Sequence, residues 1–144
     1  MYQLQVANGD MVIKGDGKAS TVSGAQRIAQ DLSCWLLEPL KTDKLYPAFG
    51  SDLGSRIGSI ISDETILAVK VEVTRVVNNY IANQQSQINS AKASDATDLI
   101  NAWNSDDIIS TINSITVTTV ADAVEVVVQL TTVGGTSITV SQST

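Results

Sequence analysis

The sequence predicts an α+β protein, in which a β-hairpin precedes a group of helices and an antiparallel sheet follows them. A turn dipeptide, Asn8–Gly9, separates two short alternating segments near the N-terminus. Apolar residues recur at helical spacing through the middle of the chain, and they alternate with polar residues through its last third. We expect one domain over residues 1–144, because no linker or fixed-period repeat divides the chain.

Composition limits the classes of function. The chain has 144 residues with a net charge of −6, one cysteine and no histidine. The negative charge argues against binding to nucleic acid or to an anionic membrane, because both require a basic face. The absence of histidine excludes Ser–His–Asp and Cys–His catalysis and the usual zinc sites, so we expect no metal and no cofactor. Cys34 alone forms no intramolecular disulfide, which fits a reducing cytoplasm, and we see neither a signal peptide nor a membrane helix.

Residues 2–14 predict two short strands around a turn. Apolar and polar residues alternate on both sides of Asn8–Gly9. The Asn-Gly pair tolerates the positive φ angles that a tight hairpin turn requires. The glycines of residues 15–18 lack the spacing of a phosphate-binding loop, so we interpret them as a flexible turn.

Four segments in the centre of the chain are expected to be helical: residues 21–38, 51–61, 63–85 and 97–111. In the first segment, Thr21 or Ser23 can cap the start. Pro39 ends this helix, because proline cannot continue the ladder of backbone hydrogen bonds. Trp35 belongs to its apolar face, whereas Arg27 falls on the opposite, polar face.

The other three helical segments differ in how firmly the sequence predicts them. Ser51 can open the second helix and Ser62 can cap the third. The many valines of the third segment leave a strand as the alternative. The polar residues 84–96 predict a surface connection, and the sequence Asn-Ser-Asp-Asp at 104–107 can break the fourth helix.

The last third of the chain predicts three strands. Apolar residues alternate with threonines in the first strand and valines dominate the second. The second and third strands flank Gly134–Gly135, so we expect them to form a hairpin. Their alternating apolar side chains include Val126, Val128, Ile138 and Val140.

Carboxylates, lysines and aromatic residues crowd between residues 36 and 54, which raises the question of an active site. A glycosidase needs two carboxyl groups about 5–9.5 Å apart, one of them with a raised pKa. The candidates here are Glu38 with Asp43 or Asp52. The nearby lysines favour ionised carboxylates, which opposes general-acid chemistry, and no Ser-x-x-Lys spacing is present. A lysozyme-like hydrolase acting on peptidoglycan therefore stays the alternative to a role without catalysis.

An ordered set of residues in this segment resembles the baseplate wedge family of contractile-tailed phages, also called W-like or sheath-initiator proteins. The family pattern is an apolar helix, a Glu-Pro-Arg element, a short loop, an aromatic residue or arginine, Pro, an acidic residue, an aromatic residue, Gly, Ser and Leu. The matching residues are Leu37, Glu38, Pro39, Tyr46, Pro47, Phe49, Gly50, Ser51 and Leu53.

The likeness covers roughly residues 5–85 and departs from the family at two positions. Leu40 stands where arginine is usual, and Ala48 stands where an acidic residue is common. Lys41 or Lys44 would have to replace the arginine in any ion pair with a neighbouring protein. Related proteins occur in bacteriocins and in type VI secretion baseplates, and all three kinds of machine remain open.

The resemblance implies a structural protein of the virion tail baseplate, assembled in the bacterial cytoplasm, that makes or breaks no bonds. Such proteins join other wedge proteins in a six-fold assembly around the tail tube. They present a fold like the terminal domain of the sheath protein, so that the first sheath ring can dock. The expected contact residues of the loop are Glu38, Pro39, Tyr46, Pro47, Phe49, Gly50 and Ser51.

The C-terminal strands suggest how the sheath protein would dock. An exposed strand edge carries unpaired N–H and C=O groups, to which a sheath subunit can add a strand. We expect Val126, Val128, Ile138 and Val140 to fix the register of such pairing. The alternative is that these strands pair only with one another and cover the helices. A further alternative is a small binding domain unrelated to phages, which neighbouring genes would distinguish.

Overall fold

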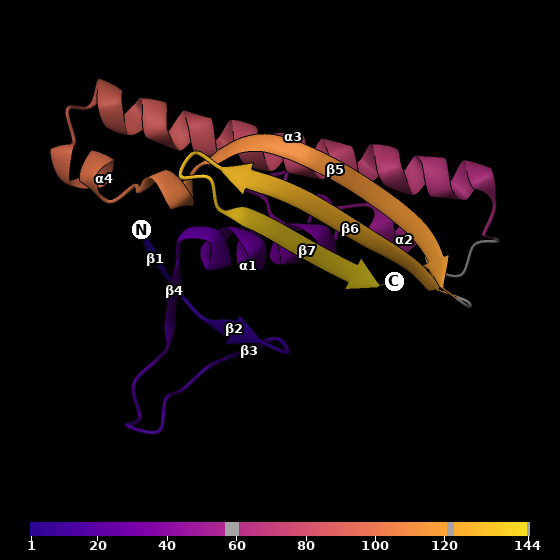
Figure 1. Ribbon diagram of the computed structural model, residues 1–144, viewed down its shortest axis with the longest axis horizontal. Helices are drawn as coiled ribbons and strands as arrows, with labels where there is room; N and C mark the ends of the chain where they lie inside the picture. Colours follow the sequence, from indigo (N-terminus) through magenta and orange to yellow (C-terminus); the bar gives the residue numbers. More distant parts are fainter. Residues whose placement is uncertain (57–60, 121–122, 144) are drawn as a thin grey trace.

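The computed structural model describes residues 1–56, 61–120 and 123–143, and it has the predicted α+β architecture. A C-terminal sheet packs against two helices, and the N-terminal strands extend away from them (Figure 1). The elements in chain order are β1 (Tyr2–Leu4), β2 (Val6–Ala7), β3 (Asp10–Met11), β4 (Thr21–Ser23), α1 (Gly24–Leu37), α2 (Leu53–Arg56), α3 (Asp63–Ala93), α4 (Thr97–Asn101), a 3-10 turn η1 (Ser105–Asp107), β5 (Ile109–Val120), β6 (Ala123–Thr132) and β7 (Ser137–Ser143).

The predicted N-terminal hairpin is confirmed. Strands β2 and β3 are antiparallel and are joined by Asn8 and Gly9, whose φ angles are +53° and +79°. Both residues therefore adopt the left-handed conformation that a tight hairpin turn requires. The structure adds a second pair that the sequence did not predict, because β1 pairs with β4 at the start of α1.

Helix α1 ends at Leu37, as the position of Pro39 predicts. The Glu38 N–H donates to the Cys34 carbonyl oxygen at 2.9 Å, and Pro39 follows outside the helix. The apolar face, which includes Leu32 and Trp35, is buried. The placement of Arg27 on a polar surface was wrong, because only 6% of this residue is exposed.

Helix α3 is longer than predicted and is not a strand. Ser62 caps it, since the Thr65 N–H donates to the Ser62 hydroxyl at 3.2 Å. The helix runs for 31 residues to Ala93, so a surface connection over 84–96 was wrong for most of its length. Gln84 is buried there and bonds to the Asp107 backbone, whereas most residues from 85 to 93 are exposed and continue the helix along the surface.

Three helical predictions were too long. The helix predicted from residue 21 begins only at Gly24, because Thr21–Ser23 form β4. Helix α4 ends at Asn101, and the predicted break at 104–107 is a 3-10 turn, in which Asn104 and Asp107 form a reciprocal capping box. This turn redirects the chain into β5, so the helical prediction for 97–111 failed at its C-terminal end. The second predicted helix is confirmed only at α2, and its residues 57–60 lie outside the described residues.

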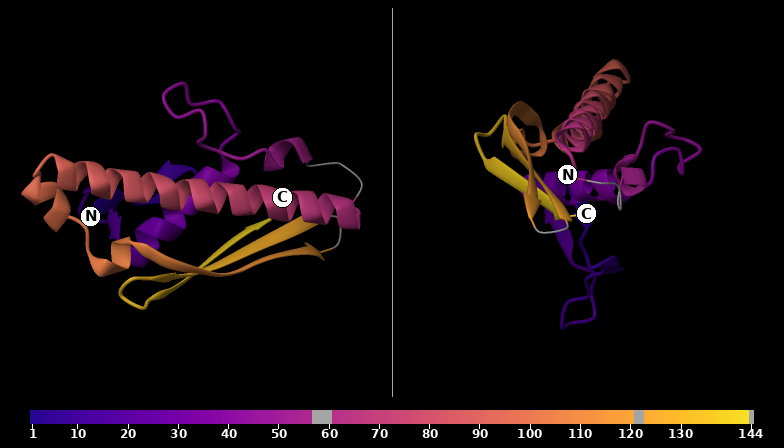
Figure 2. Two further views of the ribbon diagram at one scale, coloured as in Figure 1. Left: turned by 90° about the horizontal axis from the view of Figure 1, so that it is seen from above. Right: turned by 90° about the vertical axis from the view of Figure 1, so that its right-hand side faces the viewer.

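The C-terminal sheet has the order β5-β6-β7, and both pairs are antiparallel. Along β6, alternate residues from Val124 to Thr132 are buried, as the alternating pattern predicts for a sheet with one covered face. Helix α1 contacts β7 and helix α3 contacts β5, so the two helices cover this face together (Figure 2). Within the described residues, no helix is long and apolar enough to cross a membrane.

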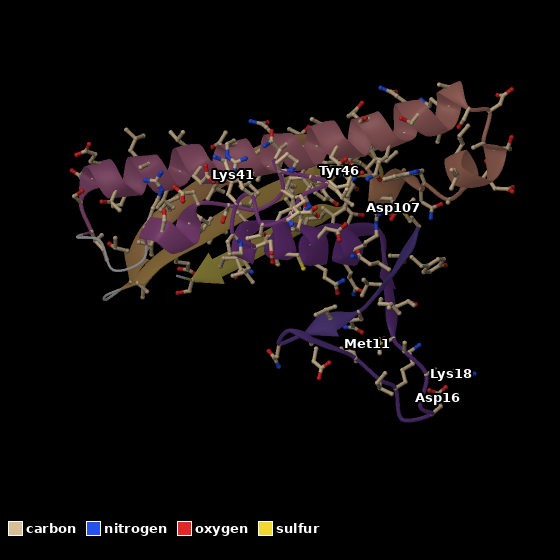
Figure 3. All side chains as sticks on the ribbon, turned by 180° about the vertical axis from the view of Figure 1, so that it is seen from behind. Met11, Asp16, Lys18, Lys41, Tyr46 and Asp107 are labelled. Atoms are coloured by element: carbon tan, nitrogen blue, oxygen red, sulfur yellow. The ribbon has the colours of Figure 1, made fainter. Side chains whose placement is uncertain are left out.

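Asp107, at the end of the 3-10 turn, is the most completely buried charged residue described, with no exposed surface. One carboxylate oxygen accepts from the Met1 amino group at 2.7 Å and from the Asn104 N–H at 3.0 Å. The other oxygen accepts from the Gly24 N–H at 2.9 Å and lies 3.4 Å from Arg27 Nε. The carboxylate thus joins the N-terminus and the start of α1 to the chain that precedes β5 (Figure 3).

The backbone of Asp107 extends this network to α3. Its carbonyl oxygen accepts from Gln84 Nε2 at 2.7 Å and from the Arg27 guanidinium at 3.3 Å. Gln84 also accepts from the Ile109 N–H at 2.9 Å, where β5 begins. The Arg27 guanidinium lies over the Trp103 ring, 4.9 Å from its centroid, so the buried cation has an aromatic partner as well.

These contacts determine the ionisation of Asp107. Burial acts to raise its pKa, but hydrogen bonds from the Met1 amino group and from two backbone N–H groups, together with the charge of Arg27, outweigh burial. The pKa of Asp107 therefore lies below its ordinary value of 3.8. A lowered pKa in the folded state means that this carboxylate stabilises the protein above pH 3.8, and that the contribution is lost as the pH falls through the folded-state pKa.

We predict that Asp107→Asn lowers the free energy of unfolding at pH 7 by about 3–5 kcal/mol, because it leaves the buried Arg27 without its anion. Urea denaturation would measure this loss. The difference from the unsubstituted protein should shrink as the pH falls below 3.8. The control, Asp98→Asn in the exposed first turn of α4, should change stability by no more than about 0.5 kcal/mol, and equal losses in both variants would contradict the prediction.

Candidate functional site

The loop between α1 and α2 is closed at its base by backbone hydrogen bonds. The Ser51 N–H donates to the Glu38 carbonyl oxygen at 2.8 Å, and the Leu40 N–H donates to the Ser51 carbonyl oxygen at 2.9 Å. Pro39 and Ser51 thereby form a parallel bridge. The buried Ser51 hydroxyl also donates to the Leu36 carbonyl oxygen, so the base of the loop is attached to the end of α1.

Gly50 allows the two ends of the loop to approach each other. Its φ of +92° lies in the region that favours glycine. A Cβ atom at this position would lie 2.6 Å from the Glu38 carbonyl oxygen and 2.8 Å from that of Pro39. The Phe-Gly-Ser element therefore needs its glycine because two backbone segments come into contact at this position.

An ion pair on α3 holds the same base from the other side. Arg75 donates to both carboxylate oxygens of Glu72, at 2.7 and 2.9 Å, and to the Gly50 carbonyl oxygen at 2.9 Å. Glu72 in turn accepts from the Asp52 N–H at 2.7 Å. The hydrogen bond from Arg75 lowers the pKa of Glu72 more than burial raises it, so the pair stays charged at neutral pH.

Glu72 and Arg75 were not among the residues predicted to form the site, although the sequence contains a signal for them. Glu72 lies among the apolar positions of α3, between the buried Val69 and Val73. A carboxylate on the buried face of a helix requires a partner, and Arg75 is three residues away on the same face. This signal predicts an ion pair but does not show that the pair holds a distant loop.

The tip of the loop is ordered by its own turn and points into solvent. Asp43 accepts from the backbone N–H groups of Leu45 and Tyr46, at 2.8 and 3.1 Å. Leu45 is 87% exposed and Tyr46 is 60% exposed. Figure 2 shows the loop on the side of the helices opposite to the sheet, and Figure 3 labels Tyr46 and Lys41 on it. The loop therefore combines a fixed base with an exposed apolar tip.

The other predicted loop residues divide between the interior and the surface. Phe49 packs edge-to-face against Trp35, with ring centroids 4.9 Å apart, so it belongs to the supporting core. Pro39 and Pro47 are exposed. Glu38 is also exposed and accepts from the Thr42 hydroxyl at 2.8 Å, which is a hydrogen bond inside the loop.

The four strand residues predicted to set the register with a partner lie in the protein's own core. Val126 and Val128 are buried on β6, the central strand, and Ile138 and Val140 are buried on β7. Their side chains pack inside this chain, and a part for them in binding a partner stays a prediction. Within the part of the chain that the structure describes, β7 pairs with β6 alone, so its other edge is open to a partner strand.

A hollow lies beside this open edge of β7. Its walls come from β7, from the N-terminal hairpin and from α1. The apolar lining includes Val6, Leu37 and Ala29. Thr139 and Ser141 line the hollow from β7. A segment that added to β7 would thus meet side chains from three parts of the chain.

The carboxylates of the hydrolase alternative all have structural partners. Asp43 caps the turn at the loop tip, Glu38 accepts from Thr42, and Asp52 lies 3.6 Å from Arg56 in an ion pair. Among the described residues, no group of three or more acidic or cysteine side chains could hold a metal ion. Nothing in this arrangement favours hydrolysis, which stays an untested alternative.

Comparisons with known proteins do not assign the chain to a family. No protein-family model matches the chain, and no match was found among curated proteins or solved structures. The likeness of residues 37–53 to baseplate wedge proteins therefore stays a hypothesis. It rests on the ordered loop residues, of which Gly50 and Ser51 have clear structural roles here.

We predict that Gly50→Ala destabilises the base of the loop. The new methyl group would contact two carbonyl oxygens and the backbone would be strained, so we expect the free energy of unfolding to fall by about 1–3 kcal/mol. Amide hydrogen exchange at Leu40 and Ser51 should become faster, because their hydrogen bonds close the base.

Gly54→Ala is the matched control for this substitution. Gly54 lies in α2, and a Cβ atom there would meet no atom within 4 Å. Alanine should therefore leave stability unchanged or raise it by up to about 1 kcal/mol. Unchanged exchange at Leu40 in the Gly50→Ala protein would refute the proposed role of the glycine.

Proposed function

We propose that this protein is a structural component of a contractile-tail baseplate, in which it joins wedge proteins and provides a docking site for the first sheath ring. The observation that carries the proposal is the loop after α1, which has a clamped base and an exposed tip and contains the residues that resemble wedge proteins. The open edge of β7 provides the second contact surface. Both surfaces recognise other proteins by shape and hydrogen bonding, without catalysis.

The loop is well suited to binding a protein because little of it must become ordered. Its base is held by Ser51, Gly50 and the Glu72–Arg75 pair, and Asp43 organises its tip. Preorganised loops lose less conformational entropy on binding than mobile ones do. The exposed Tyr46 supplies an aromatic anchor of the kind that is enriched among interface hot spots.

The structure of the loop bears on the first departure from the family pattern, at Leu40. Leu40 replaces the usual arginine, and its backbone N–H is used to close the loop base. Lys41 follows it at an exposed position with a φ of +69°, at the start of the projecting tip. We infer that Lys41 provides the positive charge that the arginine would provide in relatives of this kind.

The edge of β7 is the site at which a sheath strand would add. Backbone groups at an open edge supply the hydrogen bonds, and neighbouring side chains select the strand. The hollow beside β7, lined partly by Val6 and Leu37, offers apolar contacts for that selection. Repetition around a ring would raise the total affinity through avidity without new contacts.

The first test concerns the loop. Glu38→Ala and Tyr46→Ala should leave stability within about 0.5 kcal/mol, because both side chains are exposed. Each should reduce the amount of this protein in purified tail particles, measured by quantitative mass spectrometry, by about tenfold if one hot spot is lost. Val133→Ala, at another exposed apolar position, is the control. Normal incorporation of the Glu38/Tyr46 double variant would count against the loop contact.

The second test concerns the strand edge. A protein with both Thr139→Lys and Ser141→Lys should fold but should yield baseplates that bear no sheath, because edge lysines oppose strand addition. Gln129→Lys, on the same exposed face but on the central strand, should leave sheath assembly unchanged. Electron microscopy of particles would distinguish these results, and normal sheaths on the double-lysine baseplates would refute docking at β7.

A further inference from the structure

Two adjoining hollows contain nearly all of the aromatic side chains of this protein. The chain has six aromatic residues, and five of them line one hollow or the other. The hollows meet at four shared residues, so they form one continuous surface, which we call the aromatic trough. Its aromatic members are Tyr2, Trp35, Tyr46, Tyr80 and Trp103.

The first half of the trough is a rigid wall between β1, α1 and α3. Trp35 and Tyr80 pack edge-to-face with centroids 5.7 Å apart, and the Tyr80 hydroxyl donates to Asp31 at 3.1 Å. Burial raises the pKa of Asp31, with hydrogen bonds and Arg27 acting in the opposite direction. Arg27, which also lines this half, is already engaged with Asp107.

The second half of the trough follows the last turns of α3 and carries no charged side chain. Tyr46 contributes from the loop, and Leu99 and Trp103 contribute from α4 and the chain after it. The α3 wall consists of the amide and hydroxyl residues Asn83, Ser86, Gln87, Ser90 and Ser94, together with Ala91. In the part of the chain that the structure describes, the amide groups of Asn83 and Gln87 have no hydrogen-bond partner and are available to a ligand.

We propose that the aromatic trough binds a neutral oligosaccharide. A sugar ring has apolar C–H faces, which pack on accessible aromatic rings such as those of Tyr2 and Tyr46, and a rim of hydroxyl groups that both donate and accept hydrogen bonds. The side chains of Asn, Gln and Ser also both donate and accept, so they match that rim. The two hollows have volumes of about 250 and 450 Å³, which suits a ligand of a few sugar units.

The chemistry of the trough fits a sugar better than a peptide. An extended peptide needs a strand edge to satisfy its backbone groups, whereas the backbone of α3 is already hydrogen-bonded within the helix. An amphipathic helix needs a continuous apolar groove, whereas amide and hydroxyl side chains interrupt the α3 wall of this trough. The second half offers a charged ligand only the Met1 amino group, which already pairs with Asp107. The sugar proposal does not depend on the baseplate proposal, and either can fail alone.

Titration of the intact protein with defined neutral tetrasaccharides tests the proposal. Chitotetraose, cellotetraose and maltotetraose are the probes, and the fluorescence of Trp103 reports binding because this half-buried ring lines both halves of the trough. We expect saturable binding of at least one probe with a Kd at or below about 1 mM. No binding of any of the three probes at about 10 mM would overturn the proposal.

Paired variants locate the binding site. Asn83→Ala with Gln87→Ala should weaken binding at least about tenfold, because both amides are lost from the trough. Asn78→Ala with Gln85→Ala removes two exposed amides of the same helix that lie outside it. This control should bind as tightly as the unsubstituted protein, and circular dichroism would show that both variants remain helical.

A third comparison tests the aromatic contact. Tyr46→Ala should also weaken binding about tenfold, while Leu45→Ala, the neighbouring exposed residue of the same tip, should not. Equal affinities in the trough variants and in their controls would overturn the assignment of the site. Sugar binding by this protein, combined with normal sheaths on baseplates that carry Thr139→Lys and Ser141→Lys, would support this proposal and refute docking at β7. Absence of sugar binding, combined with loss of sheaths in that variant, would refute this proposal alone.

Discussion

The fold depends on one buried carboxylate that segments distant in the chain share. Asp107 lies between the N-terminus, the start of α1 and the start of β5, and its backbone reaches Gln84 on α3. An ion in such a site is stable only when every oxygen has a partner, and here both oxygens do. The burial of Arg27 against the Trp103 ring follows from the same requirement, because the anion needs a cation beside it.

A second group of contacts connects the core to the loop at the surface. Trp35 near the end of α1 packs against Tyr80 of α3 and against Phe49 of the loop. The Glu72–Arg75 pair then binds the backbone at Gly50, so the base of the loop belongs to the core although its tip does not. The loop residues that resemble wedge proteins therefore fall into two groups. Some support the base of the loop, and others are exposed at its surface.

The open surfaces face in different directions, which suits a protein that connects others. The loop tip lies on the side of the helices opposite to the sheet (Figure 2), and the free edge of β7 lies on the sheet side. The aromatic trough runs along α3 and includes Tyr46 of the loop. One small protein can thus offer contact surfaces on two sides, with the helices lying between them.

The sequence by itself determined the features that depend on neighbouring residues. Asn8–Gly9 specified the hairpin, Pro39 the end of α1, and alternation the three C-terminal strands. Only the tertiary structure decided that Arg27 is buried and that α3 continues to Ala93. Local patterns fix turns and periodicity, whereas a polar residue enters the core only if a partner far along the chain, as Asp107 is for Arg27, compensates its desolvation.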